Sequence, residues 1–180
     1  GCCLEEGAIE VQRATDPEHR TKLWRARKKA FGAMGRIAPD LLVQDATVPR
    51  TKLPEVLAGI DDIGSRYGLK IANVFHAGDG NLHPNILFDR QNQKELELVE
   101  RASKEIMQLC VDAGGTITGE HGVGLDKREY MTLVYGPAEL QAMAAAKQVF
   151  DPDSLFNPGK VLPEVEGAEL GVAMKASTVS

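Results

Sequence analysis

The chain has 180 residues and a mass of 19.5 kDa, enough for one domain with a hydrophobic core that needs neither disulfide nor metal in order to fold. Its 21 basic and 26 acidic side chains give a net charge of −5, which argues against nucleic acid as the main partner. No apolar run approaches the roughly 18 residues that cross a bilayer. We therefore expect a cytoplasmic protein that associates with membranes at most through its partners.

A helix is predicted over residues 17–34, since Asp16 and Pro17 form a helix start and apolar side chains then recur at helical spacing. Arg27 is unusual there because it lies on the same stripe as Leu23 and Met34. Residues 8–11 resemble a strand, yet no turn or other element that would lead into a strand precedes them in the sequence. We therefore expect a fragment, with a sheet that is incomplete at the N-terminus.

The rest of the pattern predicts an α+β fold, an antiparallel sheet with helices on one face. We expect this domain to extend over residues 1–163. A tail rich in small and polar residues, 164–180, is expected to be disordered. The predicted strands are 41–48, 69–76, 82–88 and 116–118, and the further helices are 52–67, 91–110 and 137–149.

The segment His76-Ala-Gly-Asp-Gly-Asn-Leu-His83 has a glycine-rich turn between two predicted strands. Folding this hairpin brings the two histidines together, as a two-histidine metal site requires. Asn85 has the same strand parity as His83 and points the same way. The alternative, that both are structural histidines, stays open.

The segment Gly115-Thr-Ile-Thr-Gly-Glu120-His121-Gly places a carboxylate beside an imidazole among glycines. If the segment is extended, Glu120 and His121 face opposite ways and have different tasks. Two histidines and one carboxylate make a three-ligand site with an open position, and the remaining imidazole can act as a base. A glycine-rich turn with a capping glutamate is the alternative.

These two segments, together with LWRARKKAF, QDATVPR and the closing FDPDSLFNPGKVLP, resemble the C-terminal half of the FAD-linked oxidase family. That family includes the D subunit of glycolate oxidase and D-lactate dehydrogenases, the members that these motifs resemble most. The resemblance implies a cap domain, ferredoxin-like in fold, of a flavin-dependent 2-hydroxy acid dehydrogenase. The FAD would be held mainly by a domain outside this chain.

The resemblance also implies roles for single residues. His76, His83 and Glu120 would hold a divalent metal such as Zn or Mn, and His121 would be the base. The resemblance implies that Arg27 and Asn85 contact the 2-hydroxy acid substrate. It implies that Asn81 and Asn157 contact the flavin cofactor. The implied partners are an FAD-binding domain and the iron–sulfur subunits of a glycolate oxidase complex.

Two positions depart from members that act on hydroxyglutarate. Phe31 and Val43 align where those enzymes carry threonine and lysine for a second carboxylate, which favours a small monocarboxylic acid. Two alternatives stay open. The chain is either an inert cap that assembles flavin and iron–sulfur subunits, or a metal-dependent hydrolase that uses His76, His83 and Glu120.

Overall fold

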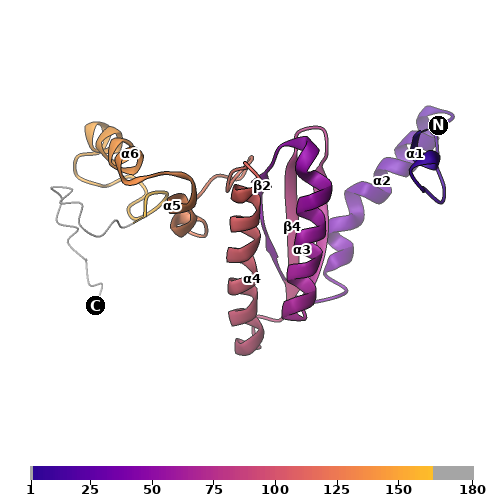
Figure 1. Ribbon diagram of the computed structural model, residues 1–180, viewed down its shortest axis with the longest axis horizontal. Coiled ribbons are helices and arrows are strands. Elements are labelled where there is room, and N and C mark those ends of the chain that lie inside the picture. The colour runs from indigo at the N-terminus through magenta and orange to yellow at the C-terminus, as the bar shows by residue number, and fades with distance from the viewer. Residues whose placement is uncertain (1, 164–180) are drawn as a thin grey trace.

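An antiparallel sheet with two long helices on one face forms the centre of the molecule, as seen in the computed structural model, which describes residues 2–163 (Figure 1). Strand β4 (Asn81–Phe88) is central. It pairs along one edge with β3 (Lys70–His76) and along the other with β1 (Asp40–Val43) and then β2 (Ala46–Thr47). The predicted α+β class with an antiparallel sheet is confirmed.

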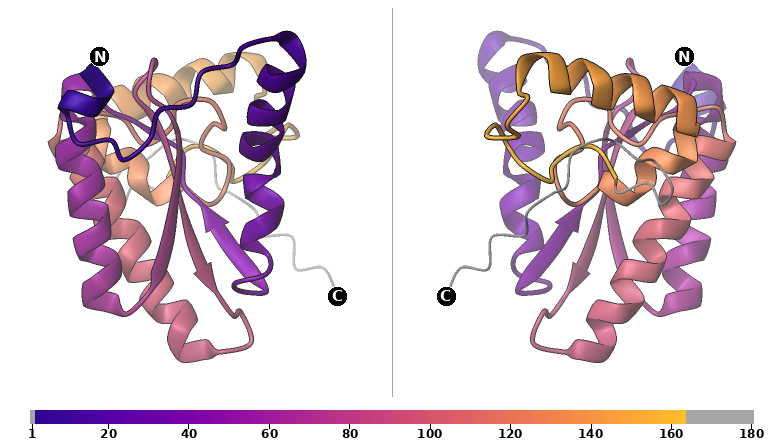
Figure 2. Two further views of the ribbon diagram at one scale, coloured as in Figure 1. Left: turned by 90° about the vertical axis from the view of Figure 1, so that its right-hand side faces the viewer. Right: turned by 90° about the vertical axis from the view of Figure 1, so that its left-hand side faces the viewer.

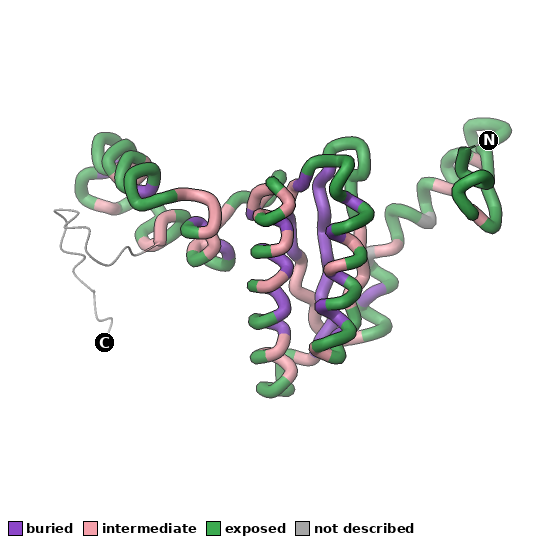
Figure 3. Tube along the Cα trace, viewed as in Figure 1, coloured by how far each residue is buried: buried purple, intermediate pink, exposed green. Residues whose placement is uncertain are grey.

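Helices α3 (Leu53–Tyr67) and α4 (Gln93–Asp112) cover one face of this sheet because each has an apolar stripe at helical spacing. Figure 3 shows the buried stretch running along β4 and the inward sides of both helices. The core side chains include Val56 and Ile60 from α3, Ala102 and Ile106 from α4, and Ile86 from β4.

The remaining elements lie at the periphery (Figures 1 and 2). Helix α2 (Pro17–Met34) runs on the side of the sheet opposite to α3 and α4, and only Met34 is buried among those of its residues whose burial is described. Its start was predicted correctly, since the Asp16 carboxylate accepts the His19 N–H at 2.7 Å. The other elements are helix α6 (Pro137–Phe150) and four short ones, α1 (Cys2–Glu5), η1 (Arg50–Lys52), η2 (Arg128–Tyr130) and α5 (Met131–Val134).

Three strand predictions were wrong in whole or in part. Residues 8–11 form no strand and Ile9 is fully exposed, because no neighbouring strand pairs with them in the described chain. The predicted strand 41–48 is divided into β1 and β2. Residues 116–118 contribute only an isolated bridge between Thr47 and Thr116. The predicted disordered tail lies outside the described residues.

No helix in the part of the chain that the structure describes is both long enough and apolar enough to cross a membrane.

The Thr47–Thr116 bridge requires glycine at position 115. The Gly115 N–H donates to the carbonyl of Cys110 at 3.0 Å, and the neighbouring Thr116 N–H donates to Thr47 at 2.8 Å. A Cβ at this position would lie 2.6 Å from the Cys110 oxygen and would collide with the Thr47 oxygen. Both are backbone atoms, so neither can move without disturbing α4 or β2.

We therefore expect Gly115→Ala to destabilise the protein by about 1–3 kcal/mol, the usual cost of forcing extra volume into a packed site. Gly78→Ala is the matched control, since a Cβ there meets nothing within 4 Å. Denaturant unfolding of both variants makes the comparison. Equal midpoints would show that the close approach at Gly115 is not a constraint.

Candidate functional site

The β3–β4 hairpin brings His76 and His83 together, as the sequence predicts. In its register His76 pairs with Asn81 and Val74 with His83, so both histidines project from the same face of the sheet. Their ring centroids are 5.5 Å apart with the planes nearly perpendicular. This is the face opposite to α3 and α4, because the intervening Leu82 points into the core.

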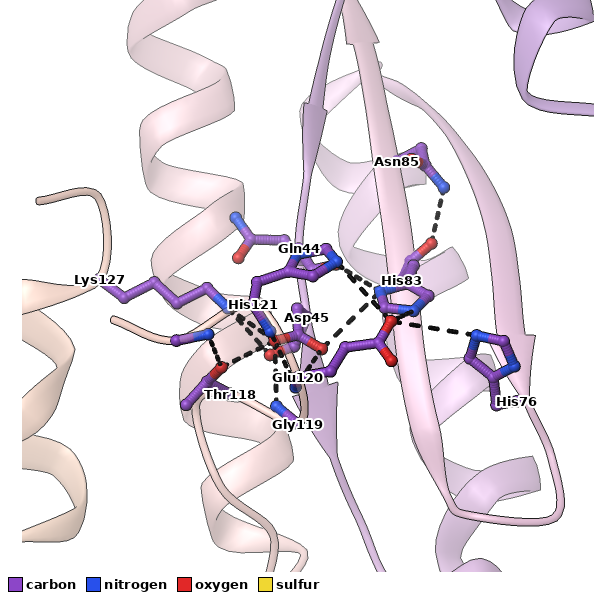
Figure 4. A network of polar contacts seen from close by, with 11 residues as sticks. Gln44, Asp45, His76, His83, Asn85, Thr118, Gly119, Glu120, His121 and Lys127 are labelled. Atoms are coloured by element: carbon purple, nitrogen blue, oxygen red, sulfur yellow. Dashed lines mark hydrogen bonds and ion pairs between the residues drawn. The ribbon is translucent and has the colours of Figure 1, made fainter. Parts of the chain in front are cut away.

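Glu120 completes a cluster on that face (Figure 4). Its Oε1 lies 3.1 Å from Nε2 of His83, 3.8 Å from Nε2 of His121 and 4.0 Å from Nε2 of His76. The rings of His83 and His121 are stacked, with centroids 5.0 Å apart. His83 is buried, whereas the other three side chains are about half exposed. One carboxylate oxygen thus faces three imidazole nitrogens at the edge of solvent.

The segment that carries Glu120 and His121 is folded around a buried carboxylate, Asp45. Its Oδ2 accepts the backbone N–H of Gly119 at 3.0 Å, of Glu120 at 3.1 Å and of His121 at 2.8 Å, and the Thr118 hydroxyl at 2.7 Å. The segment is therefore tightly bent. The condition under which Glu120 and His121 would face opposite ways, an extended segment, is therefore not met.

Asp45 is held in its ionised form. Burial by itself would raise the pKa of Asp45, but the hydrogen bonds from the His121 N–H, the Thr118 hydroxyl and the Glu120 N–H, together with the Lys127 charge, hold it well below the usual range. The Lys127 ammonium is buried and lies 3.3 Å from Oδ2. Burial lowers the pKa of Lys127, and Asp45 opposes that effect only in part.

Sequence reasoning missed both Asp45 and Lys127. The available signal for Asp45 was that it is the one charged residue in the predicted strand 41–48, a position where a buried charge would need a partner. Lys127 gave no such signal, because it follows an exposed aspartate in a polar segment. Only the folded chain places the two side chains together.

The cluster is a candidate site for a divalent cation. Ligand atoms of Asp45, His83, Glu120 and His121 lie within 4.8 Å of one another, a group that includes His121 rather than His76. Oδ2 of Asp45 already accepts hydrogen bonds from residues 118–121, which leaves only its Oδ1 as a possible ligand atom. Tetrahedral ligands at 2.0–2.2 Å from a metal are about 3.3–3.6 Å apart, close to the observed separations around Glu120. Moreover, Nε2 of His83 and Oε1 of Glu120 are only 3.1 Å apart, a separation at which either a hydrogen on Nε2 or a metal ion would lie between the two atoms.

Two asparagines flank His83 on the same strand face. Asn81 and Asn85 are buried, and the Oδ1 atom of each lacks a hydrogen-bond partner within the described chain. The Asn85 amide donates to the backbone oxygens of Ala72 at 3.0 Å and His83 at 2.7 Å. Buried amide oxygens rarely stay without a donor, so these two are exceptions among the buried polar atoms of the described chain.

Arg27 and Asn157 lie outside this cluster. Arg27 is exposed on α2, and no ion pair or hydrogen bond among the described residues joins it to the histidines. Asn157 is exposed with φ of +47° in the turn after α6. That turn is held beside the segment after His121, because Arg128 donates to the Gly159 oxygen at 2.7 Å. The roles of both residues stay predictions.

A cavity of about 420 Å³ adjoins His121. It is bounded by β1, α4 and the segment that follows His121, and its walls combine apolar and polar side chains, among them Leu42, Gln44, Ser103, Val123, Lys127 and Tyr130. His121 therefore has the metal-ligand cluster on one side and a hollow on the other.

We expect Asp45→Asn to cost about 3 kcal/mol of stability, because the buried Lys127 loses its counter-charge and the amide cannot accept so many donors. In the wild-type protein, ionised Asp45 contributes to the free energy of unfolding, and this contribution is lost as the pH falls below about 4. The reason is that the pKa of Asp45 is lower in the folded than in the unfolded chain, so protons then favour the unfolded chain. Because an asparagine does not titrate, the Asp45→Asn variant lacks this part of the dependence of stability on pH.

Denaturant unfolding at several pH values measures both effects. Asp153→Asn is the control, because Asp153 is exposed and we expect a change within about 0.5 kcal/mol. Identical stability curves for the two variants would contradict the role of Asp45.

Comparison with known proteins identifies a family whose model matches most of the chain. Residues 1–161 match the family described as FAD linked oxidases, C-terminal domain. Glycolate oxidase subunit GlcD of Escherichia coli K12 is 46% identical over 169 residues, 93% of this chain and 34% of that protein. GlcD of Bacillus subtilis is 42% identical over 159 residues, 88% of this chain and 34% of that protein.

A mitochondrial D-lactate dehydrogenase [cytochrome] of Arabidopsis thaliana is 34% identical over 152 residues, 83% of this chain and 27% of that protein. The chain thus spans about a third of the length of the curated relatives it matches. With the family profile covering nearly all of the described residues and the two histidine-bearing motifs folded into one cluster, the chain belongs to the FAD-linked oxidases and represents their C-terminal domain.

Proposed function

We propose that this chain is the substrate-side part of a flavin-dependent 2-hydroxy acid dehydrogenase that oxidises glycolate or D-lactate to the 2-oxo acid. The observation that carries the proposal is the cluster in which one Glu120 oxygen lies 3.1–4.0 Å from the Nε2 atoms of three histidines. Similarity to glycolate oxidase subunits and a D-lactate dehydrogenase supports the substrate class.

His76, His83 and Glu120 would hold a divalent metal, Zn or Mn, for which two imidazoles and a carboxylate are a suitable donor set. Such an ion supplies Lewis acidity, which lowers the pKa of a bound 2-hydroxyl group. His83 and Glu120 are held in place by backbone contacts, whereas His76 is half exposed. His76 and Glu120, both about half exposed, are therefore accessible from solvent.

His121 would accept the proton of the 2-hydroxyl at Nε2. Its backbone is held by Asp45 at 2.8 Å and its ring by stacking on His83, so the base is positioned even though its side chain is half exposed. The hydrogen of C2 leaves with its electron pair, and the FAD that the family implies supplies the acceptor. The hydroxyl oxygen then forms the carbonyl of the 2-oxo acid.

The sheet face favours a substrate with one carboxylate. Val43 pairs with Asn85, so its side chain lies on the same face as His83 and Asn85. An apolar side chain there offers no cation for a second carboxylate. Arg27 lies on α2, which runs on this side of the sheet (Figure 2), and we propose that it pairs with the single carboxylate of the substrate.

The same proposal places an FAD-binding domain and the iron–sulfur subunits of a glycolate oxidase among the partners. One observation favours an additional assembly role. Large apolar side chains are exposed at the end of α6 and in the following turn, namely Val149, Phe150, Leu155 and Phe156. Exposed apolar groups that follow so closely in the chain are typical of surfaces covered by another protein part.

His121→Ala in the full-length, flavin-containing protein should lower kcat by about 10²–10⁴, because general-base catalysis is lost. Its content of bound metal should stay unchanged. Dye reduction with glycolate and with D-lactate provides the assay. His19→Ala is the control, since His19 lies in the first turn of α2. Normal turnover of the His121 variant would favour an inert cap with an assembly role.

His83→Ala should remove the bound divalent metal, since it deletes the most buried of the ligands. Elemental analysis of the purified full-length protein should give about one equivalent for wild type and for His19→Ala, and much less for the His83 variant. Equal metal in all three proteins would contradict the ligand set. Hydrolysis of esters or phosphates without flavin would instead favour a metal-dependent hydrolase.

A further inference from the structure

Pro84 occupies an unusual position, the middle of the central strand of the sheet. A proline has no N–H to donate, so prolines are nearly always found at sheet edges or bulges. Here β4 has β3 on one side and β1 with β2 on the other. A residue that costs the central strand a hydrogen bond needs a compensating role.

The register shows which hydrogen bond is missing. Val43 pairs with Asn85 and Ala46 with Leu82, and continuing this register across the gap places Gln44 opposite Pro84. The Gln44 N–H donates to the Pro84 oxygen at 3.0 Å. In an antiparallel pair of this kind the opposite residue returns a second bond, which Pro84 cannot make. The Gln44 oxygen therefore lacks its ladder donor, and β1 and β2 are separate strands.

The ring of His83 takes the place of that donor. Its Nδ1 lies 3.2 Å from the Gln44 oxygen, and the next polar atom facing Nδ1 is Oδ1 of Asp45 at 3.8 Å. A carbonyl and an ionised carboxylate can only accept, so Nδ1 must carry the hydrogen. Nε2 of the neutral ring is then the atom with a lone pair, and it is the one that points at Glu120.

We propose that Pro84 is a positioning residue for metal binding. Because it lacks an N–H, it leaves the Gln44 carbonyl for Nδ1–H of His83 and thereby fixes the tautomer and orientation that aim Nε2 at the ion. The inference rests on the proposed metal role of His83, Glu120 and His76. Outer hydrogen bonds of this kind commonly raise the affinity of a histidine ligand by a factor of 10–100.

The variant that tests this is Pro84→Ala, which restores a backbone N–H able to donate to the Gln44 oxygen in competition with His83. Zn²⁺ binding to the full chain is measured by calorimetry, with Pro54→Ala as the matched control. Pro54 is exposed in the first turn of α3. We expect the control to match wild type and Pro84→Ala to bind Zn²⁺ about 10–100-fold more weakly. Equal affinities for the two variants would overturn the proposal.

A second measurement determines directly which nitrogen of the His83 ring carries the hydrogen. Nitrogen-15 NMR of histidine-labelled protein, under conditions where the ring is neutral, should show hydrogen on Nδ1 of His83 in wild type and a mixture of tautomers in Pro84→Ala. Hydrogen on Nε2 in wild type, or coordination of Zn²⁺ through Nδ1, would overturn the proposal even if the variant did not fold.

The two measurements also separate this inference from the proposed function. If neither wild type nor Pro54→Ala binds Zn²⁺, the proposed metal role fails. The NMR comparison of the His83 tautomer in wild type and Pro84→Ala still tests whether Pro84 orients the ring. A ring pattern that differs between wild type and Pro84→Ala supports the action of Pro84 on His83. The same pattern in both proteins overturns it.

Discussion

The buried carboxylate of Asp45 is the constraint on which the rest of the site depends. A charge without solvent must collect donors, and Asp45 collects three consecutive backbone N–H groups, a hydroxyl and an ammonium. Those donors belong to the segment that carries Glu120 and His121 and to Lys127 beyond it. One side chain in the break between β1 and β2 therefore determines the path of a segment more than seventy residues later.

The same break in the sheet shapes the other half of the cluster. Pro84 and Gln44 cannot form a complete ladder pair, so the carbonyl of Gln44 is available to His83. Asp45 follows Gln44 directly and faces the opposite side of the sheet. Consecutive residues of one interrupted edge strand thus hold the two motifs in place, Gln44 through the His83 ring and Asp45 through the backbone of the Glu120 segment. A regular ladder would give the Gln44 carbonyl a backbone donor in place of the His83 ring.

The position of the cluster also explains why its residues differ so much in burial. His83 extends from the middle of the sheet and is covered, while His76, Glu120 and His121 come from the hairpin end and from a surface segment. The cluster therefore combines one buried side chain with three that are about half exposed. Such an arrangement suits a site where a small substrate must reach both an ion and a base.

Much of this molecule can be predicted from the sequence by itself. The helical periods predicted over residues 52–67 and 91–110 indicate α3 and α4 to within about two residues at each end, since an amphipathic stripe has to face a core. The glycine-rich turn between His76 and His83 indicates the hairpin, and strand parity places Asn85 beside His83. These features are local, because each depends on residues that are close together in the chain.

Only the tertiary structure decided how the two motifs meet. The bend that turns Glu120 and His121 toward the hairpin depends on donors that Asp45 receives across a long stretch of chain, and an extended reading of residues 116–121 could not reveal it. The division of the predicted strand 41–48 depends likewise on which residue lies opposite Pro84. Pairing register and the satisfaction of buried polar groups are properties of contacts between distant segments, and for that physical reason they emerge only when the chain is folded.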